Sequence, residues 1–213
     1  MQMKTPNKLW FFVEGDAEEE LIKRLVRYQK PDQLKLFEDL KEFLCIDTNP
    51  YPHIPCYCDN CESVDNIGHK IKQRAYQIQL IKNLEIIVIC DIEKEPCNSS
   101  RKKKILTIIT ELNQSKIKFI FFNPMIENFY FENEKIIIDV IKKAYKDKFQ
   151  KEAPIIILEK DSSSKIYLIK QSFKKYNLKY KEADFAENFF PKFDYINSTN
   201  NTIIRMLSFI NNN

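Results

Sequence analysis

The stretch LWFFVEGDAEEELI, residues 9–22, joins an apolar run, a glycine and a dense group of acids. The run LWFFV is typical of a short strand that is buried on both faces. After the glycine the spacing changes, because Leu21 and Leu25 lie one helical turn apart. Glu14 and Gly15 therefore fall on a predicted turn between a strand and a helix.

Acidic residues crowd the beginning of this predicted helix. Asp16 is a candidate N-cap, with Glu19 three residues later as in a capping box. Acids in the first turn also complement the helix dipole, which by itself can account for Glu18 and Glu20. Glu14 is different, because it precedes the helix and ends a buried strand. We therefore take Glu14 as a candidate functional residue and leave Glu18 open to either interpretation.

The rest of the chain alternates strands with helices. Further apolar strands are expected at residues 84–90 and 117–122, with a shorter one at 155–158. Helical patterns cover residues 33–43, 64–82, 101–112, 134–148, 164–176 and 199–210. This order predicts an α/β fold, a sandwich with a mostly parallel central sheet flanked by helices.

Length and composition suit one domain. The 213 residues are 44% hydrophobic, which is enough for a sizeable core. We expect a single domain over residues 1–213, with a Pro- and Cys-rich loop insertion around 48–62 and a helical C-terminal extension from about 160 to 213. No stretch of 18 apolar residues is present and no signal-peptide core precedes Glu14, so we expect a cytoplasmic protein without a membrane span.

Acids also follow the other two long strands. Asp91 and Glu93 come after the second, and Glu127 follows the third through the turn NPMIE. The carboxyl ends of parallel strands gather the chemistry of such folds, so these acids are expected to converge with Glu14. Carboxylates that lie close together repel unless a divalent cation neutralises them, and hard oxygen ligands favour Mg²⁺ or Mn²⁺. Structural alternatives are a helix cap for Asp91 and a solvated turn for Glu127.

These fragments resemble Toprim domains, the metal-binding module of topoisomerases, primases and several nucleases. FFVEGDAEEELI is similar to the VEGxTEExFL form of small bacterial Toprim-like proteins, which include the RloB-like group and the nuclease part of the overcoming-lysogenization-defect proteins. By that resemblance Glu14 is the family glutamate and Glu18 the second acid. Asp91 and Glu93 take the place of the family's Asp-x-Asp pair, with Glu93 departing from it. FFNPMIENFYF resembles the NPxFExWL stretch, which puts Glu127 at its glutamate.

The resemblance implies a Toprim-like, Rossmann-like fold and a Toprim-type nuclease with a role in phage defence. Glu14, Asp91 and Glu93 would be catalytic, and they would hold Mg²⁺ or Mn²⁺ together with Glu18 and Glu127. Gly15 would permit a tight turn or a positive φ and leave room for a phosphate. The alternatives are a catalytically silent nucleic-acid-binding module and a subunit that acts with an ATPase partner, because the chain itself has no Walker loop.

Nucleic acid, DNA or RNA, is the partner that this activity requires. The net charge of +4 is too small to indicate such a partner by itself, but charge is locally uneven. The strongest basic run is Arg101, Lys102, Lys103 and Lys104, a candidate contact to phosphates that would otherwise be a solvated helix face. Aromatic residues between Phe185 and Tyr195 either stack on bases or pack in the core.

A second cluster gathers metal-binding residue types. His53, Cys56, Cys58 and Cys61 lie within nine residues and form a candidate structural Zn²⁺ site. The alternative is a strand with buried free cysteines that leads into the helix after it.

The other cysteines, Cys45, Cys90 and Cys97, are expected in or near the core. For Cys90, beside Asp91, the alternative interpretation is a mildly activated thiol.

Overall fold

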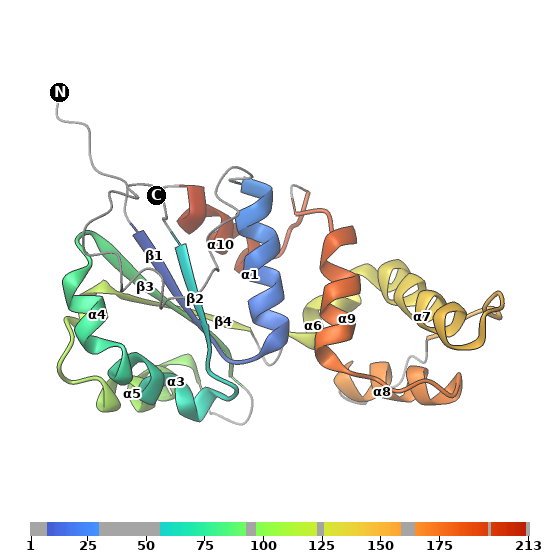
Figure 1. The fold of residues 1–213 in the computed structure, drawn as a ribbon, viewed down its shortest axis with the longest axis horizontal. Coiled ribbons are helices and arrows are strands. Elements are labelled where there is room, and N and C mark those ends of the chain that lie inside the picture. The colour runs from blue at the N-terminus through green and yellow to red at the C-terminus, as the bar shows by residue number, and fades with distance from the viewer. Residues whose placement is uncertain are drawn as a thin grey trace.

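The computed structural model describes residues 8–29, 56–92, 97–122, 126–158, 165–195 and 197–211. Its centre is a four-stranded parallel sheet in the order β2-β1-β3-β4 (Figure 1). The strands are β1 Lys8–Val13, β2 Cys56–Asn60, β3 Leu84–Asp91 and β4 Ile117–Phe122. The predicted α/β fold with a parallel sheet is therefore confirmed.

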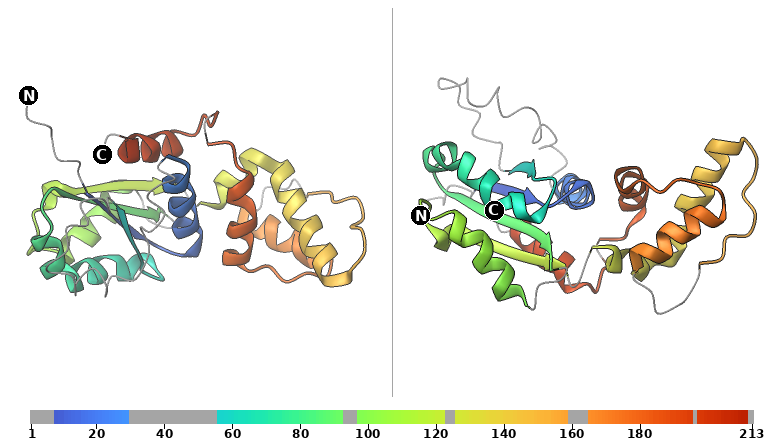
Figure 2. Two further views of the ribbon diagram at one scale, coloured as in Figure 1. Left: turned by 45° about the horizontal axis from the view of Figure 1, so that its top comes forward. Right: turned by 90° about the horizontal axis from the view of Figure 1, so that it is seen from below.

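Helices cover both faces of the sheet (Figures 1 and 2). On one face lie α3 Val64–Gln73, α4 Ala75–Leu80 and α5 Asn98–Ile108, and on the other lie α1 Asp16–Gln29 and α10 Asn201–Asn211. Alternate residues of each strand enter opposite cores, as Phe11 and Trp10 do in β1. Because both faces are buried, the strands appear in the sequence as continuous apolar runs.

A group of helices extends beyond the end of the sheet, reached through the short helix α6 Glu127–Tyr130 (Figures 1 and 2). We call α7 Glu134–Phe149, α8 Lys165–Lys175 and α9 Glu182–Phe189 the helical lobe. Single 3-10 turns occur at Gln114–Lys116, Phe131–Asn133 and Phe190–Lys192.

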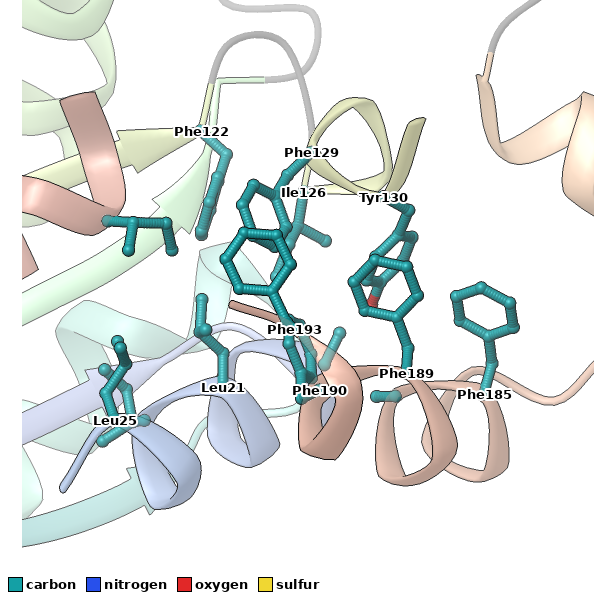
Figure 3. Packing of buried hydrophobic residues seen from close by; sticks show 14 of the residues in the cluster. Leu21, Leu25, Phe122, Ile126, Phe129, Tyr130, Phe185, Phe189, Phe190 and Phe193 are labelled. Atoms are coloured by element: carbon teal, nitrogen blue, oxygen red, sulfur yellow. The ribbon is translucent and has the colours of Figure 1, made fainter. Parts of the chain in front are cut away.

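An aromatic cluster joins the helical lobe to the sheet (Figure 3). Phe129 and Tyr130 of α6 contact Phe189 and Phe190, and this cluster continues to Leu21 of α1. Helix α9 also packs along α1. The aromatic residues between Phe185 and Tyr195 are buried, so core packing is the correct one of their two interpretations.

Several predicted elements have different bounds. The predicted helix at 64–82 is two helices that break at Arg74, and the helix expected at 101–112 is α5, which ends at Ile108. Helix α9 was not predicted. The helices expected at 134–148, 164–176 and 199–210 correspond to α7, α8 and α10, and the one at 33–43 lies outside the described residues.

The strand predicted at 155–158 is absent from the sheet. The backbone of this segment forms hydrogen bonds with the hydroxyl of Tyr176 and not with a strand of the sheet. The hydroxyl accepts the N–H of Ile157 at 3.1 Å and donates to the carbonyl oxygen of Ile155 at 3.3 Å. Part of the predicted loop insertion at 48–62 is instead the edge strand β2. This confirms the alternative interpretation of the cysteine segment, that of a strand. Residues 48–55 lie outside the described residues. None of the helices in the described residues has the length and apolar character needed to cross a bilayer.

The two glycines of the chain differ in what surrounds them, and neither has a positive φ. A Cβ at Gly68 of α3 would lie 2.8 Å from Ile108 Cδ1, 3.0 Å from Ile108 Cβ and 3.2 Å from the Ile105 carbonyl oxygen. A Cβ at Gly15 would meet its nearest neighbour at 3.6 Å, an ordinary contact distance. Gly68 is therefore needed for the close approach of α3 to α5.

Gly68→Ala is expected to lower the free energy of unfolding by about 1–3 kcal/mol, because the added methyl overpacks the contact between the two helices. Gly15→Ala, the matched control, is expected to stay within about 1 kcal/mol of wild type. Urea unfolding of both variants measures the difference. Equal stabilities would contradict the close packing of α3 on α5.

Candidate functional site

The order of the strands brings the first two candidate acids together. The chain leaves β1 toward β2 and leaves β3 toward β4, so the connections diverge between the two central strands. Glu14 follows the last residue of β1, and Asp91 is the last residue of β3. In open parallel sheets the crevice beyond this divergence is where ligands bind.

Hydrogen bonds hold both acids at the carboxyl ends of the two central strands. Glu14 Oε2 accepts the backbone N–H of Asp91 at 3.0 Å. The Asp91 side chain is 5% exposed, and its Oδ1 accepts the N–H of Ile126 at 2.9 Å. Asp91 thus joins the end of β3 to the beginning of α6, so it does cap a helix, although not the one that follows it in sequence.

Glu18 is buried in the same region. Its side chain is 3% exposed, and its Oε2 accepts the N–H of Gly15 at 3.1 Å. Because α1 begins at Asp16, Gly15 occupies the N-cap position and Glu18 is the capping-box acid. The prediction that Asp16 and Glu19 fill these positions was wrong by one residue. A favourable interaction with the dipole of α1 does not by itself require the Glu18 side chain to be buried.

Asn60, which sequence reasoning missed, holds the remaining acids of the first turn. Its Nδ2 donates to Asp16 Oδ1 at 2.9 Å and to Glu19 Oε2 at 3.0 Å. Asn60 ends β2, so the amide orients the beginning of α1 from the neighbouring strand. Glu19 also pairs with Lys23, one helical turn further on, at 2.7 Å.

A further acid reaches the site from the helical lobe. A Cβ on Gly15 would lie 3.6 Å from Glu18 Oε2 and 4.0 Å from Glu182 Oε1, so the glycine leaves space between these two carboxylates. Burial raises the pKa of Glu182, the nearby charge of Asp16 raises it further, and Lys170 opposes both. No local pattern could reveal Glu182, because it is remote from Glu14 in sequence.

The carboxylates act together on the thiol of Cys90. Burial raises the pKa of this thiol first, followed by the negative charges of Glu14, Asp91 and Glu18, while Arg101 opposes them. This shift is opposite to that of an activated thiol, so the core interpretation of Cys90 is correct. The same three carboxyl groups all lie close to this thiol, near the ends of β1 and β3.

Carboxylate oxygens are suitable ligands for Mg²⁺ or Mn²⁺, so the donor types of Glu14, Glu18 and Asp91 fit such an ion. Within the described residues, however, no three His, Cys, Asp or Glu side chains are placed to hold a metal. Glu93 lies outside the described residues, and the side chain of Glu127 is not described either. A complete metal site would need ligands from these residues or a rearrangement of the acids.

The predicted basic run divides into two parts. Arg101 is 5% exposed, its Nη2 donates to the Ile92 carbonyl oxygen at 3.1 Å, and its Nη1 lies 4.0 Å from Asp65. Its guanidinium therefore positions the chain after β3, and the prediction that it contacts phosphate is corrected. Lys102, Lys103 and Lys104 are exposed on α5 and remain candidates.

The cysteine segment does not form the predicted half of a zinc site. Cys58 packs against the core that contains α1, whereas Cys61 belongs to the core on the opposite face of the sheet. His53 lies outside the described residues, and the side chain of Cys56 is not described. Burial raises the pKa of Cys58 well above its usual value and that of Cys61 to about 12, as expected for structural thiols.

We expect Cys58, Cys61 and Cys90 to resist alkylation of the native protein between about pH 7 and 9, because their raised pKa values leave little thiolate. Cys97 is exposed rather than in or near the core as predicted, and among the four cysteines whose side chains the structure describes it is expected to react first. Mass spectrometry after iodoacetamide treatment locates the modified residues. EDTA should leave the pattern unchanged, and faster reaction of Cys58 and Cys61 after chelation would instead indicate a bound zinc ion.

The chain was also compared with known proteins. No protein-family model, curated protein or solved structure matches it. What the site does must therefore be argued from its residues and their arrangement.

Proposed function

We propose that the protein is a metal-dependent nuclease of the Toprim type, which hydrolyses phosphodiester bonds in DNA or RNA. The observation that carries this proposal is the hydrogen bond between Glu14 and the end of β3, which brings two acids together where the connections of a parallel sheet diverge. Buried Glu18 adds a third carboxylate. The strand order supports the Toprim resemblance, because it makes neighbours of the two segments that resemble the family motifs.

Glu14, Glu18 and Asp91 would hold Mg²⁺ or Mn²⁺ together with Glu93 and Glu127. The metal, when bound, supplies Lewis acidity toward the phosphodiester and lowers the pKa of water. The chain's own contribution is to fix the acids. A backbone N–H holds one oxygen of each of Glu14, Glu18 and Asp91, which fixes these side chains near the ends of β1 and β3.

Gly15 supports the same proposal. It lies at the N-terminus of α1, where backbone N–H groups attract anions. The absence of a side chain at this position would let a phosphate approach the backbone beside the acids.

The test is a cleavage assay on single- and double-stranded DNA and RNA with Mg²⁺, Mn²⁺ or EDTA. We expect metal-dependent cutting of at least one substrate class. A phage-defence role would follow from protection of bacteria against phage by the wild-type gene and its loss in the Glu14→Gln variant.

Two alternatives make different predictions. A catalytically silent binding module would retain nucleic acid in EDTA and would not cut it with any metal. This alternative is based on Glu93, which stands where the Toprim family has an Asp. A subunit of a larger complex would cut only when an ATPase partner is added. Absence of cutting by a folded protein under every metal condition would exclude an autonomous nuclease.

A further inference from the structure

Positive charge is concentrated in the part of the chain that forms the helical lobe. Residues 134–192 contain 14 lysines, no arginine and nine Asp or Glu, a net charge of +5. The whole chain has a net charge of +4, so the remainder carries −1. The candidate site is rich in acids, and the lobe beside it is rich in lysine.

A pocket, which we call the groove, lies on this lobe between α7 and α9. Its lining includes Val140, Phe173 and Phe185, whose side chains are buried beneath it. Three exposed lysines line it, Lys143 from α7 and Lys179 and Lys181 from the segment that leads into α9.

Two acids and an amide also line the groove. Asp184 pairs with Lys181 at 3.4 Å, Lys143 donates to Asn188 Oδ1 at 2.6 Å, and Asp147 lies on the α7 side. The groove therefore keeps one net positive charge, and it lies on a strongly positive lobe.

The groove and the candidate site adjoin each other. Lys181 lines the groove, and the next residue, Glu182, has its Oε1 4.0 Å from the position of a Cβ on Gly15. Lys170 is close enough to Glu182 to lower its pKa, so α8 adds positive charge beside the same point. A strand that crosses the beginning of α9 would thus pass directly from the acids to the lysines.

We propose that this groove binds the phosphate backbone of the nucleic-acid strand on which the acidic site acts. The inference rests on the proposed nucleic-acid substrate and locates it on the helical lobe. Lysine is a point charge that contacts phosphates without base readout, so the groove would strengthen binding with little sequence preference.

The test is binding of fluorescein-labelled single-stranded DNA and RNA in EDTA, measured by anisotropy between about 50 and 200 mM salt. All proteins carry Glu14→Gln so that the probe stays intact. The groove variant is Lys143→Gln with Lys179→Gln and Lys181→Gln. The matched control, Lys82→Gln with Lys116→Gln and Lys118→Gln, removes the same charge near the amino ends of β3 and β4, away from the site.

We expect the groove variant to bind at least about tenfold more weakly near 0.1 M salt and to lower the slope of log affinity against log salt by about 2. The control variant should stay within about twofold of its parent. Asp147→Asn with Asp184→Asn removes two negative charges from the same groove and should tighten binding. This second variant keeps the test decisive if the lysine variant folds poorly.

Equal binding by the groove and control variants, without tightening by the asparagine variant, would overturn the inference while leaving cleavage by the wild type unaffected. The converse result, weaker binding by the groove variant without cleavage by the wild type, would support the groove and remove the proposed nuclease. Binding of poly-glutamate in place of nucleic acid would indicate an acidic protein partner and would also overturn it.

Discussion

Glu14→Gln is expected to lower metal-dependent cleavage by about 10²–10⁴-fold while the protein stays folded. The substitution removes the negative charge that a metal ion or a proton transfer requires. It retains a side-chain oxygen that can accept the N–H of Asp91, so the junction between β1 and β3 is kept. Cleavage rates and urea unfolding, measured on one preparation, separate loss of activity from loss of structure.

Glu20→Gln is the matched control for this variant. Glu20 lies on α1, the helix that follows Glu14, and its carboxylate pairs with Arg24 one turn further on, so cleavage should stay close to the wild-type rate. Asp91→Asn should resemble Glu14→Gln, and the double variant should be little worse than either, because residues that act as one unit are not additive. Wild-type cutting in all of these variants would show that a contaminating nuclease, not this site, produced it.

Asp59→Ala is expected to lower the free energy of unfolding by about 3 kcal/mol. Asp59 is buried in β2, where its Oδ2 accepts the indole N–H of Trp10 at 3.0 Å and its Oδ1 pairs with Arg74 at 3.2 Å. Trp10 is fully buried, so removal of the carboxylate takes away the acceptor that its indole N–H has inside the core. Urea unfolding followed by far-ultraviolet circular dichroism measures the change.

Trp10→Phe separates the two partners of Asp59. This variant removes the indole N–H but keeps an aromatic ring in the core, and it should be less damaging than Asp59→Ala because it leaves the pair with Arg74 intact. In a double-mutant cycle the two substitutions should couple, because they remove the same hydrogen bond. A loss below about 1 kcal/mol in Asp59→Ala would mean that water replaces the carboxylate and that the network is not structural.

The site was predictable where it depended on strand ends. Glu14 and Asp91 follow apolar runs, and a parallel sheet gathers the ends of such runs at one edge. Arg101 was misplaced because a basic run looks the same whether its first residue is exposed or turned inward to bond the Ile92 carbonyl. The zinc prediction for Cys58 and Cys61 failed for a similar reason. Cys58 lies in β2 and Cys61 follows it, and residues three apart along an extended chain point to opposite faces of the sheet.

The sequence by itself determined the class of fold, since continuous apolar strands that alternate with amphipathic helices require a parallel sheet covered on both faces. It also determined which acids stand at the ends of those strands. Only the tertiary structure decided that β1 lies beside β3, that Glu182 faces Gly15, that Asp59 joins Trp10 to Arg74, and that a lysine-lined groove adjoins the acids. The physical reason is that local patterns record the burial of each residue, whereas the identity of a distant partner depends on how the elements pack.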